Sequence, residues 1–370
     1  MSKTRDEAMA VEATKYAMRV RQDVSNGHDE PDEYTFLDYD TIVRLMKLYK
    51  VLAKVMRLHA PLFRWKPGRV PLRLFGARSC VEGRVVPTAL GKELLPYANE
   101  HMEGNRRQFP KHEFHPLIEL FGRHVRQIDS YVGIPTEEAC TKLNECIKAM
   151  RAEARTKAFQ NKRDRHLRAS REATQGLRAL VDELFRRRSR ILVVSLVLSY
   201  RIDATVFTAR PIKDLINRVS EQEAREHRDE FIRFVKREYR VPLLTYAWKE
   251  ELGLFTSYHY HVLLFFDGSV AYDGFSVGNE IGHHWIDTIT NGRGRFHNSH
   301  ASKQWRSGVG CINYYETGKI KALKELVIPY LTKTDYFVRL VAKGRTFGKG
   351  GLPKTKGNKR GRPRKHSFDL

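Results

Sequence analysis

The longest strongly apolar segment of the chain, ILVVSLVLSY at Ile191–Tyr200, limits the possible folds more than any other segment. It is far shorter than the roughly eighteen apolar residues that indicate a membrane-spanning helix. Its length and its β-branched valines and isoleucine are instead typical of a buried β-strand. We therefore expect a globular domain built around this strand, and no other segment of the chain approaches a membrane span.

The segments that follow this strand indicate the fold class. Hydrophobic periodicity and turn residues predict two further strands and three helices, the last interrupted by Pro329. In chain order these are a helix at 212–239, strands at 243–251 and 257–268, and helices at 280–290 and 320–341. Such an order, β-α-β-β-α-α, predicts an α+β domain with an antiparallel sheet.

The α+β domain occupies residues 185–342, and one region lies on each side of it. Residues 1–184 are expected to form a mainly helical basic region. Residues 343–370 carry ten Lys and Arg against one acid and are rich in glycine and proline. Because such a segment cannot bury a core of its own, we expect a disordered tail there.

The charge balance indicates the kind of partner. Lys and Arg number 67 against 43 Asp and Glu, a formal net charge of +24. A surplus of this size attracts polyanions, and nucleic acid is the commonest one in a cytoplasm, with a membrane surface as the weaker alternative. The N-terminal segment lacks the apolar core of a secretory signal, and the four cysteines have no C-x-x-C spacing. We expect a cytoplasmic protein with free thiols that binds nucleic acid.

Two histidines at the start of the third strand are the first candidate site. His259 and His261 are two residues apart, so on a strand both imidazoles project from the same face. If the strand before it pairs antiparallel, either Glu250 or Glu251 can reach that face. Two imidazoles and a carboxylate suit a divalent cation with open positions for a phosphodiester oxygen. The alternative is a pair of histidines that serves only packing.

A tyrosine and a lysine on the last helix complete a possible reaction centre. Tyr330 and Lys333 are three residues apart, which places them on one face of a helix. A phenol with a pKa near ~10 is a poor nucleophile at neutral pH unless a cation stabilises its phenolate. Both Lys333 and a bound metal could supply that charge.

Taken together, these motifs resemble a known family. The pair His259-Tyr260-His261, a preceding acid, and the downstream Tyr330-Leu331-Thr332-Lys333 are similar to the HUH endonuclease signature of rolling-circle replication initiators. Their order looks most like the inovirus gene-two replication proteins, a group that includes the YagK/YfjJ C-terminal domain of prophages. The resemblance covers about residues 185–342 and implies an HUH-type catalytic domain.

The resemblance also implies roles for these residues. His259, His261 and Glu251 would hold Mn²⁺ or Mg²⁺, Tyr330 would be the nucleophile and Lys333 its cationic partner. The implied reaction nicks one DNA strand at a phage or prophage origin and leaves a 5′-phosphotyrosine. Single-stranded or hairpin origin DNA, duplex DNA held by the basic regions, and host replication proteins are the implied partners. Many relatives carry a second tyrosine, for which Tyr336 is a poor match because it lies six residues from Tyr330.

The tail contains a second DNA-binding candidate. Its Arg-Gly-Arg-Pro sequence is similar to an AT-hook, which enters the narrow minor groove of A·T-rich DNA because glycine carries no side chain. The residues concerned are Arg360, Gly361, Arg362, Pro363, Arg364 and Lys365. A solubilising tail is the alternative at this place. For the whole chain, the alternative is a DNA-binding regulator of a mobile element without catalytic activity, and Tyr314 and Tyr315 are the fallback nucleophiles if Tyr330 is not used.

Overall fold

The computed structural model describes most of the chain, and its described residues divide into two compact units. The helical unit comprises residues 40–168 and 336–339, and the sheet unit comprises 169–335 with 33–39 and 340–352. The described residues are 33–74, 77–98, 106, 109–201, 219–253, 257–301, 308–332 and 334–352. Within these ranges no helix is both long and apolar enough to cross a membrane.

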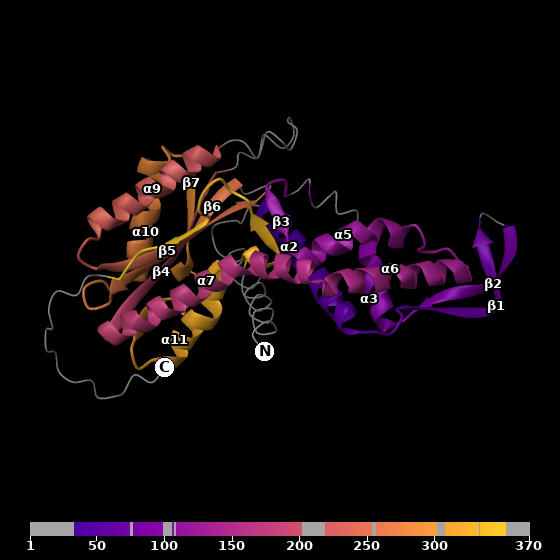
Figure 1. The fold of residues 1–370 in the computed structure, drawn as a ribbon. Helices are drawn as coiled ribbons and strands as arrows, with labels where there is room; N and C mark the ends of the chain where they lie inside the picture. The colour runs from indigo at the N-terminus through magenta and orange to yellow at the C-terminus, as the bar shows by residue number, and fades with distance from the viewer. Residues whose placement is uncertain are drawn as a thin grey trace. The chain divides into compact units, whose positions relative to one another are not determined.

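An antiparallel sheet forms the centre of the sheet unit, which confirms the expected α+β class (Figure 1). Its strand order is β10-β5-β6-β4-β7, and β8 also pairs with β4. Every described strand pair in it is antiparallel. The strands are β4 (Arg190–Tyr200), β5 (Leu243–Gly253), β6 (Ser257–Asp267), β7 (Gly294–Asn298), β8 (Gly310–Asn313) and β10 (Phe347–Lys349).

Helices cover both faces of this sheet. On one side, here called the α7 face, lie α7 (Lys157–Arg187), α11 (Thr317–Ala322) and α12 (Ile328–Thr332). On the opposite side, the α9 face, lie α9 (Glu221–Glu238) and α10 (Gly274–His284). Because β4 and β6 are central and covered on both sides, their sequences are continuous apolar runs without polar alternation.

The segment 317–340 differs from the single interrupted helix expected at 320–341. α11 runs into a π-helical turn at Leu323–Val327, α12 follows, and a 3₁₀ turn at Thr334–Tyr336 leads into β9 (Val338–Leu340). Pro329 has no amide hydrogen, so the chain cannot continue a regular hydrogen-bond ladder through it. The fold also extends past residue 342, because β10 pairs with β5.

The helical unit combines long helices with two small antiparallel pairs. Its helices are α2 (Glu33–Arg57, of which the part from residue 40 belongs here), α3 (Ala89–Ala98), α5 (Pro116–Asp129), α6 (Glu137–Arg155) and the start of α7. A hairpin of β1 (Phe63–Leu74) and β2 (Ala77–Pro87) interrupts the region that the sequence predicted to be mainly helical. β3 (His112–Phe114) pairs with β9, whose residues come from the far end of the chain.

Candidate metal centre and active site

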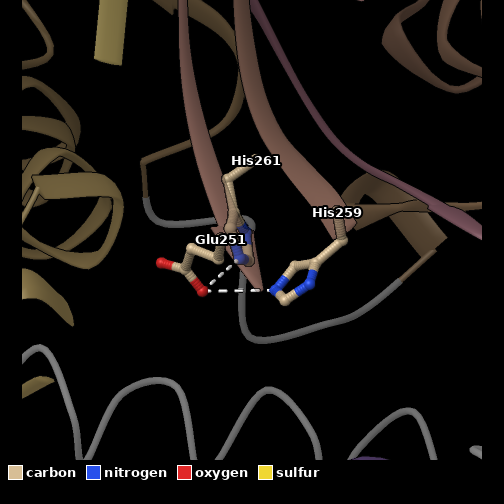
Figure 2. Close-up of side chains that lie close together, drawn as sticks. All are labelled: Glu251, His259 and His261. Carbon is tan, nitrogen blue, oxygen red and sulfur yellow. Dashed lines mark hydrogen bonds and ion pairs between the residues drawn. The ribbon is translucent and has the colours of Figure 1, made fainter. Parts of the chain in front are cut away.

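The register of β5 and β6 brings one carboxylate to the two histidines. Glu251 lies directly opposite His259, and Lys249 lies directly opposite His261. The Oε2 atom of Glu251 is 3.2 Å from Nε2 of His259 and 3.2 Å from Nε2 of His261 (Figure 2). One ligand atom from each of these three residues lies within 4.8 Å of the others, a separation that a single metal ion can bridge.

The period of two along a strand explains which glutamate takes part. Ala247 on β5 and Leu263 on β6 belong to the core of the α7 face. Counting by twos from them places Glu251, His259 and His261 on that same face. Glu250 points the other way, so the choice that the sequence left open between the two neighbouring acids falls on Glu251 by register.

The hydrogen bond of His259 bears on whether these residues fit a metal. Its Nδ1 lies 3.3 Å from the backbone carbonyl oxygen of Ser257, which can only accept, so this contact is a hydrogen bond when Nδ1 carries a proton. If that is the only proton on the ring, Nε2 is an acceptor that faces the Glu251 carboxylate, another acceptor. A cation between the two, or a second proton on the ring, resolves this conflict. The donor set of two imidazoles and one carboxylate therefore fits a divalent metal.

The electrostatics of Glu251 keep it ready to bind a cation. Burial by itself would raise the pKa of this carboxyl group. The charge of His261 and hydrogen bonds from both imidazoles outweigh burial and hold the pKa well below its usual range. Since a metal ligand must be deprotonated, Glu251 is in the required state throughout the neutral range.

Glu250 has a different environment on the α9 face. Its side chain is fully buried, and the Arg228 guanidinium lies 3.4 Å from its Oε2. The same guanidinium lies over the Trp248 ring, 4.3 Å from the ring centroid. Burial raises the pKa of Glu250, and the charge of Arg228 only partly offsets it. Two adjacent acids thus have opposite pKa shifts because the strand points them to opposite faces.

Tyr330 stands beside the histidine pair. Its ring meets the His261 ring edge-on, with centroids 5.1 Å apart and an interplanar angle of 88°. α12 carries Tyr330 and is fixed to α7 at its last residue. The Thr332 carbonyl accepts a hydrogen bond from Ser170 at 2.7 Å, and the Thr332 hydroxyl lies 2.7 Å from that of Thr174. These buried contacts define the position from which the phenol can act.

A buried lysine that sequence patterns missed lies on the same face. Lys249 is 1% exposed, and its Nζ is 2.9 Å from Oδ1 of Asp335 and donates to the Glu250 carbonyl at 3.0 Å. Asp335 follows Tyr330 by five residues, so this ion pair ties the turn after α12 to β5. The position of Lys249 within a predicted strand, two residues before Glu251, was the only sequence feature that could have indicated it. Its partner Asp335 could not be identified without the fold.

The other sequence candidates fall elsewhere or outside the described residues. Tyr336 belongs to the helical unit, where it is buried with its hydroxyl 3.0 Å from that of Tyr49. Tyr314 and Tyr315 meet each other edge-on with ring centroids 5.5 Å apart, and Tyr315 is 57% exposed. Lys333 and the AT-hook-like segment 360–365 lie outside the described residues.

Comparison with known proteins assigns the chain to a family. A family model for the YagK/YfjJ C-terminal domain matches residues 151–335. The match runs from the end of α6 to Asp335 and includes Glu251, both histidines and Tyr330. No curated protein and no solved structure matches the chain. Since the matched segment makes up half of its 370 residues, the chain belongs to the YagK/YfjJ C-terminal domain family.

Proposed function

We propose that this protein is a metal-dependent DNA strand-nicking and strand-joining endonuclease of the HUH type, which initiates rolling-circle replication of a phage or prophage. One arrangement carries the proposal. Glu251, His259 and His261 converge on one point of the sheet, and the ring of Tyr330 lies against that of His261. The formal net charge of +24 supports DNA as the substrate.

Each residue has a defined part in the proposed reaction. A divalent cation, Mn²⁺ or Mg²⁺, held by Glu251, His259 and His261 would polarise an oxygen of the scissile phosphate as a Lewis acid. The contact with His261 orients the ring of Tyr330. Lys249 and Asp335 hold the turn that follows Tyr330 against β5, and Lys333 remains the proposed cationic partner of the phenol.

The bond changes explain why the reaction is reversible. The phenolic oxygen of Tyr330 attacks phosphorus and loses its proton to solvent. A tyrosine–phosphate bond forms at the 5′ side, the bond to the 3′-oxygen breaks, and that oxygen takes up a proton. No water is consumed, so the energy of the phosphodiester is retained in the phosphotyrosine. The free 3′-hydroxyl can prime synthesis and later attack in reverse to rejoin the strand.

A covalent adduct tests the proposal directly. Single-stranded and supercoiled DNA from the regions flanking the gene would be incubated with the full chain and Mn²⁺, then denatured. We expect an adduct at the 5′ end of the cut with wild-type protein and with Tyr315→Phe, a matched control at an exposed tyrosine. Tyr330→Phe should give none, and His261→Ala should lose nicking while its DNA affinity stays within about threefold, because the metal acts on catalysis more than on binding.

Other outcomes would redirect the assignment. An adduct that persists in Tyr330→Phe and maps to Tyr314, Tyr315 or Tyr336 would move the nucleophile and leave the reaction class in place. If wild-type protein binds DNA but no substrate gives an adduct with any divalent metal, the endonuclease proposal fails. The protein would then be a DNA-binding regulator.

A further inference from the structure

The β1–β2 hairpin of the helical unit, here called the ribbon, is a strongly basic element outside the candidate active site. Its sequence from Phe63 to Pro87 carries six Lys and Arg and one acid, Glu82. The two strands pair with each other along nearly their whole length. Figure 1 shows the ribbon extending away from α3 and α6, the helices at its base.

Three described cations share one face of the ribbon. Arg64 is opposite Val86 and Lys66 is opposite Arg84 in the register, so all three cationic side chains project from the same side. All three are exposed, and no acid among the described residues pairs with them. Lys66 and Arg84 are directly cross-strand neighbours, an arrangement that destabilises a sheet by like-charge repulsion. A bound polyanion would relieve that repulsion.

The opposite face of the ribbon is apolar at the same level. Trp65 lies across from Val85, and its indole occupies the space beside Gly83. A Cβ atom at position 83 would come within 2.2 Å of the Trp65 ring, so glycine is required for this packing. At the level of Trp65 and Arg84, the ribbon therefore has one apolar face and one cationic face.

The β1 edge of the ribbon is unsuited to binding another strand. Pro67 and Pro71 lie within β1 and cannot donate backbone hydrogen bonds to a neighbour. A register shift between Pro67 and Val70, with Gly68 at φ +141°, interrupts the same edge. Proline, bulges and positive charge are the devices that prevent strand addition. A partner that adds a strand to the β1 edge is therefore disfavoured.

We propose that the ribbon is a duplex-DNA arm that enters the major groove and sets Arg64, Lys66 and Arg84 against backbone phosphates. The B-form major groove is about 12 Å wide and admits a two-stranded β-ribbon. The inference rests on the proposed function only in taking DNA as the partner, and it does not depend on the nicking chemistry. The arm would add affinity for double-stranded DNA to a protein whose sheet unit cuts one strand.

Salt dependence of duplex binding tests the arm. Each phosphate contact adds about 0.9 to the slope of log affinity against log salt concentration. The triple variant Arg64→Ala, Lys66→Ala, Arg84→Ala should therefore lose about 2 to 3 units of slope and on the order of 100-fold in duplex affinity at physiological salt. Fluorescence anisotropy with a labelled B-form duplex at four salt concentrations measures both.

Matched variants separate the ribbon from general charge. Lys47→Ala, Lys92→Ala, Lys148→Ala removes three exposed cations from the helices of the same unit and should change the slope by less than one unit. Arg64→Lys, Arg84→Lys keeps the charge and should keep the wild-type slope. An unchanged slope in the ribbon triple variant, or equal losses in both triple variants, would overturn the proposal.

A comparison of duplex DNA, duplex RNA and single-stranded DNA provides a second test of groove binding. The major groove of duplex RNA is too narrow for a ribbon, so the triple variant should lose much more affinity for duplex DNA than for duplex RNA or single-stranded DNA. Equal losses on all three would show nonspecific attraction and would contradict groove binding. Nicking of single-stranded DNA by the triple variant should stay near wild-type, so a failed arm and a failed endonuclease give different results.

Discussion

At the scale of single residues, alternation along one strand separates two adjacent glutamates. Glu251 shares a face with the histidine pair, whereas Glu250 is buried against Arg228 on the other face. The pKa of Glu251 is held down and that of Glu250 is raised, although the two residues are neighbours in sequence. A one-residue slip in the pairing of β5 and β6 would exchange their roles.

Matched amide variants of these two acids test the metal centre without any DNA. Glu251→Gln removes the carboxylate from the His259 and His261 cluster, so Mn²⁺ affinity measured by calorimetry should fall at least about tenfold. Glu250→Gln makes the same substitution one residue away and should leave Mn²⁺ affinity within about threefold of wild-type. Equal weakening in both variants would contradict the assignment of Glu251 as the ligand.

At the scale of elements, sequence patterns predicted part of the architecture. Local hydrophobic patterns predicted three strands, β4, β5 and β6, and the helix α9. Buried strands of this kind appear in the sequence as apolar runs, and a helix with one buried face appears as helical periodicity. The ribbon was missed because Pro67, Gly68 and Pro71 interrupt any strand pattern. The breaks around α12 and the strand β10 depend on contacts with β5 and α7, which a local pattern does not contain.

The residues of the candidate site were likewise only partly predictable from the sequence. The two-residue spacing of His259 and His261 predicted a shared face, and the spacing of the motifs indicated Tyr330. Choosing Glu251 required the register of β5 against β6, and finding Lys249 required its pairing with Asp335. Pairing over long sequence separations is a property of the fold, so no local pattern could have supplied it.

The Lys249–Asp335 ion pair joins the turn after α12 to β5, and its loss should be costly. Lys249→Met leaves a largely buried carboxylate without its cation, so we expect the free energy of unfolding of the sheet unit to fall by about 3 kcal/mol. Urea unfolding followed by the fluorescence of Trp248 and Trp285 measures this. Adding Asp335→Asn should recover at least about 1 kcal/mol.

An exposed lysine in a similar pair serves as the control. Lys319 pairs with Glu316 three residues earlier at 2.6 Å, with its side chain 42% exposed. Because solvent screens exposed pairs, Lys319→Met should change the free energy of unfolding by less than about 0.5 kcal/mol. If Lys249→Met is equally mild, the pair does not hold the turn.

At the scale of the whole molecule, buried histidines should make the helical unit sensitive to acid. The helical unit buries His115 and His166. Burial lowers the pKa of His166 to about 4, with a further decrease from the charge of Arg339 and a partial offset from its hydrogen bond to the Tyr336 carbonyl. Burial lowers the pKa of His115 well below its usual range, and the charges of His166 and Arg163 add to the decrease.

These shifts predict acid instability of the helical unit. Between about pH 6.5 and 4 the unfolded chain binds a proton at His166 that the folded chain does not, so stability falls as the pH falls through this window. The full window corresponds to about 3 kcal/mol. Urea midpoints from circular dichroism at pH 7 and pH 5 should therefore drop less for His166→Gln than for wild-type.

A second histidine variant distinguishes this titration from a general effect of acid. His59 is exposed in the same unit, so His59→Gln should show the wild-type drop between pH 7 and pH 5. A drop of the same size in His166→Gln and His59→Gln would show that burial of His166 does not set the acid response.

The pairing of β3 with β9 has a consequence for how the protein is made. β3 ends at Phe114 and β9 begins at Val338, so the helical unit takes its last strand from near the C-terminal end of the chain. During synthesis at about 5 to 20 residues per second, β3 leaves the ribosome at least about ten seconds before its partner exists. The N-terminal unit therefore cannot finish folding first, and a nascent chain that stalls before β9 leaves β3 without its partner strand.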